Sequence, residues 1–229
     1  MYWRIAFTFT FIKKPSIPTV KNKSWPKTKV DYFILARLEK TGLQPAPPAN
    51  PHDLERRIHY ALTGLPPDGL SDIDRLMATP QYGERWARHW LDVARYADNK
   101  GYVGVGVDRR YPYSYTYRDY VIRAFNEDLP YNRFIIEQLA ADHLDLGDDK
   151  RPLAALGFLT LGRRFLNRED DIIDDRIDVV TRGFMGLTVT CARCHDHKYD
   201  PVPTADYYSL HGVFSSSTEP AELPLIGGG

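Results

Sequence analysis

The sequence predicts an all-α protein: an irregular multi-helix domain with long loops and an extended N-terminal lead-in. Three observations support this prediction. Apolar residues recur every three or four positions through most of the chain, which is the period of a helix with one buried face. Prolines and glycines separate these segments. Hydrophobic residues make up 43% of the 229 residues, which is enough to form a core.

We divide the chain into three parts. Residues 1–27 form an extended lead-in or linker, and residues 28–216 form a single helical domain. Residues 217–229 form a disordered tail that ends in glycines, where we expect the truncation point of a longer protein.

The lead-in begins with an apolar run that threonines interrupt, and no small-residue cleavage site follows it. We therefore expect no signal peptide in this fragment and a β-like extended segment in its place. In the linker that follows, Pro15, Pro18 and Pro26 favour extended backbone.

Helix start and stop signals then give the elements in order. Asn50 is expected to cap a helix that begins at Pro51. The segment 98–115 is rich in glycine and tyrosine and is expected to be a long surface loop. The predicted helices cover, in chain order, residues 29–40, 51–62, 71–79, 80–98, 116–128, 131–142, 152–161, 169–188 and 204–214.

Apolar spacing also predicts which side of each helix is buried. The predicted faces include Val30, Phe33, Ile34 and Leu38; Trp86, Trp90, Val93 and Ala97; Tyr117, Val121 and Phe125; and Tyr207, Leu210 and Phe214.

The charge balance limits the classes of partner. Formal net charge is zero and the basic residues are spread along the chain, so we expect no nucleic-acid partner. No apolar run approaches the roughly 20 residues that a transmembrane helix needs, so we expect no membrane span in this fragment.

The stretch CARCHDHKYDP, residues 191–201, contains both cysteines of the chain. C-x-x-C-H is the attachment pattern of c-type haem, in which two thiols add to the two vinyl groups of the porphyrin. The histidine that follows then becomes the proximal ligand of the iron. We therefore predict one covalent haem c on Cys191 and Cys194, with His195 as the proximal iron ligand.

Other interpretations of the motif stay open. Cys191, Cys194, His195 and His197 are zinc-ligand types, although their spacing differs from that of the usual zinc fingers. The two cysteines could also be a redox pair, which typically requires a βαβ context, or buried structural thiols.

Residues that flank the motif suggest supporting roles. Arg193 and Lys198 could pair with haem propionates, or they could be ordinary solvated cations. Asp196 or a backbone carbonyl could accept a hydrogen bond from Nδ1–H of His195 and so fix its tautomer. His197 could support the site, but we expect it to be an exposed histidine.

The sixth iron ligand is not fixed by the motif. His89 is a candidate because it lies between two tryptophans of a predicted helix, which could line one haem face. The other candidates are His143, His211, Met77 and Met185.

Two further segments are candidates for function. Tyrosines recur in residues 111–120, where we expect them to pack the loop onto the core, with a sugar-stacking platform as the alternative. Acidic residues crowd residues 168–178, but the spacing of a calcium-binding EF-hand loop is missing, so we expect a solvated helix start.

Most of the chain resembles the planctomycete-type cytochrome-associated domain, a family of unknown function (the second planctomycete cytochrome domain, domain of unknown function 1549). GERWARHWLD and CARCHDHKYDP are the most specific of the matching stretches, and the likeness runs from about residue 30 to residue 214. The sequence departs from the family pattern between residues 67 and 82, where a helical insert is shortened.

The resemblance implies a cytochrome-like domain of a large secreted bacterial protein, located in the periplasm or outside the cell. It implies electron transfer with a redox partner or a fused cytochrome domain. Two alternatives remain: an enzyme, or a module of one, that acts on polysaccharide-related substrates, and a haem-free metal-binding or structural interaction domain.

Overall fold

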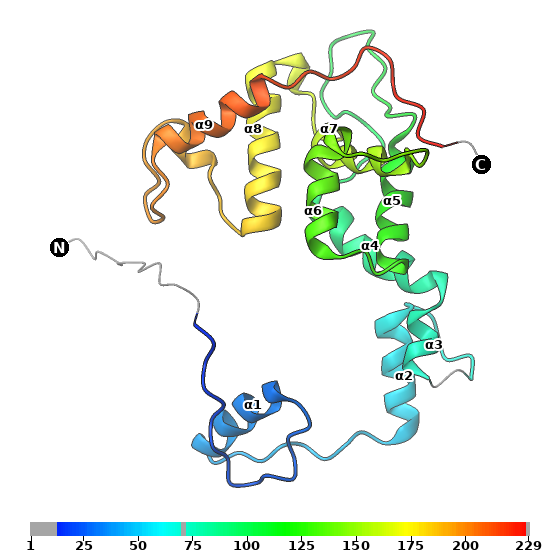
Figure 1. The fold of residues 1–229 in the computed structure, drawn as a ribbon, viewed down its shortest axis with the longest axis vertical. Helices are drawn as coiled ribbons and strands as arrows, with labels where there is room; N and C mark the ends of the chain where they lie inside the picture. The colour runs from blue at the N-terminus through cyan, green and yellow to red at the C-terminus, as the bar shows by residue number, and fades with distance from the viewer. Residues whose placement is uncertain (1–12, 70–71, 228–229) are drawn as a thin grey trace, which may run out of the picture. The chain divides into compact units, whose positions relative to one another are not determined.

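The computed structural model describes residues 13–69 and 72–227, and its regular elements there are helices (Figure 1). The only β-type pairing in this part of the chain is one isolated bridge, Asn99 to Arg110, inside the long loop. The all-α prediction is confirmed, whereas the β-like segment predicted for residues 1–12 lies outside the described residues. The α-helices are α1 (Lys29–Lys40), α2 (Pro51–Leu62), α3 (Ile73–Met77), α4 (Pro80–Val93), α5 (Ser114–Asn126), α6 (Tyr131–Ala140), α7 (Gly157–Thr160), α8 (Glu169–Val180) and α9 (Thr204–Ser215).

Shorter turns connect these helices. A π-helical turn, η4, extends α8, and in the described part of the chain four short 3₁₀ turns join the other elements. The turns are η1 (Ala141–His143), η2 (Arg151–Leu156), η3 (Phe165–Asn167), η4 (Thr181–Met185) and η5 (Thr190–Arg193).

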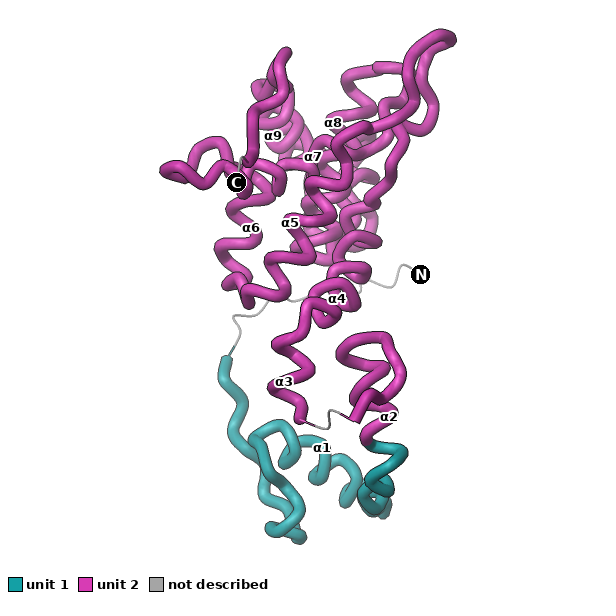
Figure 2. Tube along the Cα trace, turned by 90° about the vertical axis from the view of Figure 1, so that its right-hand side faces the viewer, with its two compact units in different colours: residues 1–54 teal, residues 55–229 magenta. Residues whose placement is uncertain are grey.

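The chain forms two compact units, residues 1–54 and residues 55–229 (Figure 2). The boundaries that we predicted at residues 27 and 216 stay predictions. None of the helices in the described residues is both long and apolar enough to span a membrane.

In the first unit, the lead-in is fastened to α1. The carboxylate of Glu39 accepts hydrogen bonds from the backbone N–H groups of Lys21, at 2.9 Å, and Asn22, at 3.0 Å. These bonds lower the pKa of Glu39. Leu35, one turn before Glu39 on the same helix face, is buried, as is Val20 of the lead-in. The lead-in therefore lies against the Leu35–Glu39 side of α1.

The predicted buried face of α1 was wrong. Val30, Phe33 and Ile34 are all exposed, while Leu35 is buried. The physical reason is that hydrogen bonds to Glu39, which apolar spacing cannot reveal, decide which side the lead-in covers. The predicted cap of α2 is confirmed, since Oδ1 of Asn50 accepts a hydrogen bond of 2.9 Å from the N–H of Asp53.

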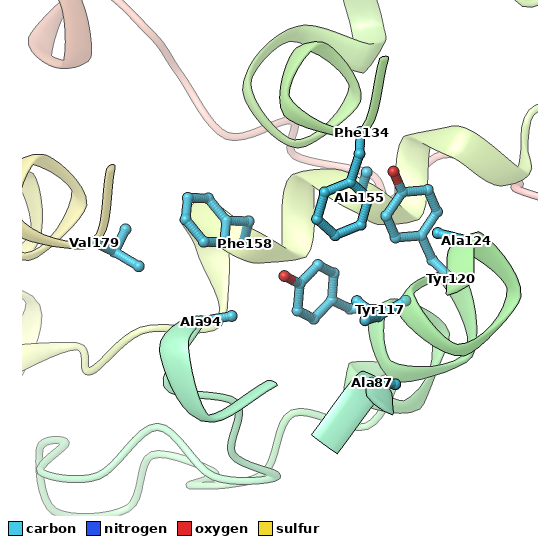
Figure 3. Packing of buried hydrophobic residues seen from close by; sticks show 10 residues of the cluster. Ala87, Ala94, Tyr117, Tyr120, Ala124, Phe134, Ala155, Phe158 and Val179 are labelled. Carbon is cyan, nitrogen blue, oxygen red and sulfur yellow. The ribbon is translucent and has the colours of Figure 1, made fainter. Parts of the chain in front are cut away.

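The second unit contains a cluster that we call the aromatic core (Figure 3). Phe158 is completely buried there, and Trp90 stacks on it with ring centroids 5.8 Å apart. Phe184 from η4 packs on the same ring at 5.0 Å. The buried members of the aromatic core are Ala87, Ala94, Tyr117, Tyr120, Val121, Ala124, Phe134, Ala155, Phe158 and Val179.

Helix α4 ends at Val93, and its buried face differs from the predicted one. Trp86 and Val93 are exposed, whereas Gly83 and Ala87 are buried. A Cβ atom on Gly83 would lie 2.5 Å from the carbonyl oxygen of Ile122, so α4 and α5 approach too closely for a larger side chain. The face of α4 that packs on α5 is therefore formed mainly by small residues and not by the tryptophans.

Buried polar groups in the aromatic core satisfy one another. Nε1 of Trp90 donates to Oε1 of Gln138 at 2.8 Å, and the hydroxyl of Tyr117 donates to the same oxygen at 2.7 Å. The Tyr120 hydroxyl donates to Glu137 at 3.0 Å, and Glu137 also pairs with Arg133. Such a network fixes one arrangement of the rings, because a broken bond would leave a buried group unpaired.

The tyrosine run divides between core and surface. Tyr117 and Tyr120 are buried in the aromatic core, while Tyr113 and Tyr115 are exposed. The hydroxyl of Tyr111 donates to the carbonyl of residue 162 at 2.8 Å. Tyr111 thus ties the loop to residue 162, as expected, whereas Tyr117 and Tyr120 pack in the core from helix α5 and not from the loop.

A smaller cluster lies between α8 and α9, and we call it the α8–α9 core. Ile177 and Tyr207 are completely buried in it, and Leu210 and Phe214 pack against it, as predicted for α9. Its buried members are Ile173, Ile177, Val189, Ala192 and Tyr207.

The segment 217–227, predicted as part of a disordered tail, has a defined contact. The carboxylate of Glu219 pairs with Arg164 at 2.8 Å and also with Arg176. This part of the chain is therefore fastened to α8 and to the turn before it.

Candidate functional site

The cysteine motif lies on the short turn η5 between α8 and α9 (Figure 1). Both cysteines are exposed free thiols. Cys191 lies in η5, and Cys194 is its C-terminal cap, with its N–H 3.5 Å from the carbonyl oxygen of Cys191. A 3₁₀ helix has three residues per turn, so this spacing puts the two cysteines on one side of the turn. Ala192 lies between them and is completely buried in the α8–α9 core. Burial of this alanine turns the two cysteines toward the surface.

The ring of His195 is exposed and oriented by the next residue. Its Nδ1 lies 2.8 Å from the carbonyl oxygen of Asp196. A carbonyl oxygen can only accept, so Nδ1 carries the proton, and the neutral ring then has its free lone pair on Nε2. This is the backbone-carbonyl contact that we predicted, and it prepares His195 to bind a metal through Nε2.

The side chain of His197 is largely buried, contrary to the expectation of an exposed histidine. Its side chain is only 7% exposed, and its Nδ1 accepts hydrogen bonds from the backbone N–H of Asp200, at 2.9 Å, and of Tyr199, at 3.4 Å. The backbone of His197 also donates to the carbonyl of Val202 at 2.9 Å. His197 therefore holds together the loop that follows the motif.

These contacts bear on the zinc interpretation. Nδ1 of His197 is occupied by backbone donors. Within residues 13–69 and 72–227, no group of three or more His, Cys, Asp or Glu side chains is arranged to hold a metal ion. Cys191, Cys194, His195 and His197 thus do not form a preassembled tetrahedral site.

Arg193 turns toward α8. Its Nη1 lies 3.2 Å from Oδ1 of Asp171 and 3.7 Å from Oδ2 of Asp174. The hydrogen bond to Asp171 raises the pKa of Arg193. Lys198 lies with Nζ 5.1 Å from the centre of the Tyr199 ring. The pairing of Arg193 and Lys198 with propionates stays a prediction, and Arg193 would have to share its charge with two aspartates.

The start of α8 is exposed at Arg168, Glu169 and Asp170, as expected for a solvated helix start, whereas the aspartates further along the helix are tied into the fold. Oδ1 of Asp174 accepts a hydrogen bond of 2.6 Å from the hydroxyl of Tyr207, and Asp175 pairs with Arg95. Burial, reinforced by Asp174, raises the pKa of Tyr207. Oδ1 of Asp178 accepts from the hydroxyl of Thr190 at 3.2 Å, at the start of η5.

Sequence reasoning missed these supporting residues. Asp171, Asp174 and Tyr207 hold Arg193 and α9 in place, although the two aspartates lie 17 or more positions before Cys191 and Tyr207 lies 12 positions after His195. The only sequence signal was that one face of a helix repeats aspartate at three- and four-residue spacing. That spacing does not indicate which residues the aspartates bind.

The structure does not bring His89 to the motif. His89 is exposed on α4, where its ring packs on Trp86 at 5.5 Å, and α4 packs mainly on α5. The turn η5 packs on α8 and α9 instead. Of the other candidate sixth ligands, His211 lies on α9, with Nε2 3.5 Å from Oδ1 of Asp170. The remaining candidates, His143, Met77 and Met185, are exposed on η1, α3 and η4.

Comparison with known proteins gives a family. The searches of curated proteins and of solved structures found no significant match to this chain. A family profile matches residues 29–71 and 70–219, which is most of the chain and includes the cysteine motif. The chain therefore belongs to the PSCyt2 family, described as a protein of unknown function (DUF1549).

Proposed function

We propose that this chain is a c-type haem domain that passes single electrons to or from a redox partner or a fused cytochrome domain, in an extracytoplasmic compartment. One observation carries the proposal: two exposed thiols share one side of a 3₁₀ turn, and a histidine with a free Nε2 follows directly. Thiols buried among packed side chains, or joined in a disulfide, would argue against it.

The residues present fit the chemistry of the group. Cys191 and Cys194 would hold the haem through two thioether bonds, each formed by addition of a thiol across one vinyl group, with the thiol proton ending on the other vinyl carbon. His195 offers a neutral nitrogen donor, the type that haem iron takes as its proximal ligand. Bound haem would supply one-electron redox chemistry.

The backbone around the motif would hold these donors in place. Ala192 is buried beneath the turn, and Asp196 fixes the ring of His195 through its carbonyl. The loop bonds of His197 close the next turn. Together these contacts restrict the motion of the donors before any cofactor arrives.

The same contacts favour a second candidate, a haem-free interaction module. Arg193 and His197 satisfy their hydrogen bonds within the protein, so the motif has a defined fold on its own. In that case the exposed cysteines would be incidental to a structural turn.

Expression of the chain in a host that attaches c-type haem distinguishes the two candidates. The haem-domain proposal predicts a pyridine haemochrome spectrum whose pigment stays with the polypeptide after acid–acetone extraction. The C191S/C194S double variant should lose it, and H143A, in an exposed histidine of η1, should keep it. Wild-type protein without bound haem in that host would favour the interaction module. Where haem is bound, a reversible one-electron titration would support electron transfer.

A further inference from the structure

A hollow of about 470 Å³ lies away from the cysteine motif, between the long loop and the segment that leads into α8. It is lined by Gly101, Tyr102, Arg109, Arg163 and Phe165. The lining thus combines two aromatic rings and two guanidinium groups, and no acidic residue is among them.

The two arginines of the hollow have free donors. Within the described residues, neither the guanidinium of Arg109 nor that of Arg163 forms a hydrogen bond or an ion pair, and both side chains are exposed. Their sequence neighbours differ. Arg110 is bound by Asp108, and Arg164 is bound by a carboxylate of the C-terminal segment. Guanidinium groups without a carboxylate partner, on a shared hollow, leave room for an external anion.

The hollow is built by backbone contacts between its two walls. The N–H of Arg164 donates to the carbonyl of Lys100 at 3.1 Å, and the N–H of Leu166 donates to the carbonyl of Tyr102 at 3.2 Å. The three residues of η3 have left-handed φ angles of 43°, 58° and 64°, although none is glycine. Strained backbone of this kind persists only where its surroundings enforce it, and it is frequent at ligand sites.

We propose that this hollow binds a small ring-bearing carboxylate, such as an aromatic acid or a uronic acid. A planar guanidinium matches a carboxylate through paired N–H···O bonds, and two of them discriminate strongly for negative charge. The exposed ring of Tyr102 and the half-buried ring of Phe165 offer flat apolar faces against which the ligand ring stacks. The site is independent of the cysteine motif and of the haem proposal.

The test is titration of the ¹⁵N-labelled chain with benzoate and with galacturonate, read by NMR at amide and arginine Nε–H signals. We expect saturable shifts at the hollow residues for at least one of these acids, and weaker binding of the neutral analogues benzamide and galactose. R109Q and R163Q should each weaken the acid by roughly fivefold, which is the upper range for an exposed charge pair. The matched control R110Q, in the neighbouring arginine that Asp108 already binds, should change the affinity less than twofold.

The variants also separate ring from charge. Tyr102 is 84% exposed, so Y102A should leave the fold intact while it weakens the ring-bearing acid more than acetate. Tighter binding of benzoate would indicate an aromatic acid as the ligand, and tighter binding of galacturonate would indicate a uronic acid. Absence of saturable shifts with both acids, or binding that R109Q and R163Q leave unchanged, would overturn the proposal.

Discussion

The aromatic core and the α8–α9 core belong to one unit but differ in size and in how their polar groups are paired. The aromatic core is large, with the buried ring of Phe158 stacked on the half-buried ring of Trp90 and with internal polar groups paired to one another. The α8–α9 core has five buried residues, and ion pairs such as Arg193 with Asp171 supplement it at its edge. The cysteine motif lies on the smaller core.

This difference indicates that the two cores have different roles, one in stability and one in supporting the cysteine motif. The aromatic core contributes most of the apolar burial that stabilises the unit, since burial of apolar area is the main favourable contribution. The α8–α9 core keeps only one side of η5 covered and leaves the thiols and the ring of His195 at the surface. The proposed haem attachment would need such an open site.

Arg95 connects the two cores. It follows α4, and its Nε donates to Asp175 of α8 at 3.1 Å. Its Nη1 donates to the carbonyl of Phe158 at 3.2 Å, in the aromatic core. The comparison can therefore be tested at each core and at this link.

The largest effect is expected in the aromatic core. F158A removes a completely buried ring and should lower the free energy of unfolding by about 3–5 kcal/mol. Urea denaturation followed by circular dichroism measures it. V213A, in an exposed valine of α9, is the control and should stay within about 0.5 kcal/mol of wild type. An equally small effect of F158A would contradict the assignment of stability to the aromatic core.

The second-largest loss of stability is expected at Arg95, which connects the two cores. R95A leaves Asp175, which is mostly buried, without its cation and should cost about 2–3 kcal/mol in unfolding free energy. The matched control is R182A, since Arg182 also pairs with an aspartate of α8 but is largely exposed, and this change should cost less than about 1 kcal/mol. Equal costs for the two variants would show that Arg95 does not join the cores.

A smaller, local effect is expected below the motif. H197A removes the acceptor for two backbone N–H groups and should cost about 1–2 kcal/mol. Hydrogen exchange should accelerate in residues 197–202, while exchange in α5 stays unchanged. On the haem proposal, attachment should survive in this variant, because the proposed iron ligand is His195 and not His197. Loss of covalent haem in H197A, with normal attachment in H143A, would assign His197 a larger role.

The smallest effect concerns pH. Burial alone would raise the pKa of Glu219, but hydrogen bonds and charge from Arg164, together with Arg176, lower it. The folded chain then binds fewer protons than the unfolded chain at this group. Its contribution is present above the unfolded pKa of about 4.3 and is lost as pH falls through the folded value.

E219Q measures this contribution. Glu219 is 39% exposed, so we expect a loss of only about 0.5–1 kcal/mol at about pH 7, and a smaller difference from wild type at about pH 3. Thermal unfolding of both proteins across that range provides the values. A gap between them that widens as pH falls would contradict the lowered pKa of Glu219.

Helix positions could be predicted from sequence because apolar spacing and breakers are local signals. Pro51 and Pro80 begin helices as expected, and the loop between α4 and α5 was anticipated. The orientation of α4 could not be predicted, because the close approach of Gly83 to Ile122 depends on a neighbouring helix. Side-chain size at a contact is a tertiary property that periodicity does not contain.

The candidate site was partly predictable for the same reason. Cys191, Cys194 and His195 are adjacent in sequence, so a local motif identifies them. The burial of His197 depends on how the chain turns back at Val202, and the hollow joins segments around residues 102 and 163 that carry no shared motif. Such groupings appear only when the fold is known.

Peptide mapping tests the central claim most directly. The chain is produced in a host that attaches c-type haem, digested, and analysed by mass spectrometry. We predict that the peptide containing Cys191 to His195 carries the mass of one haem, and that this mass is absent from C191S/C194S. An unmodified peptide from wild type, or haem attached elsewhere in the chain, would contradict the claim.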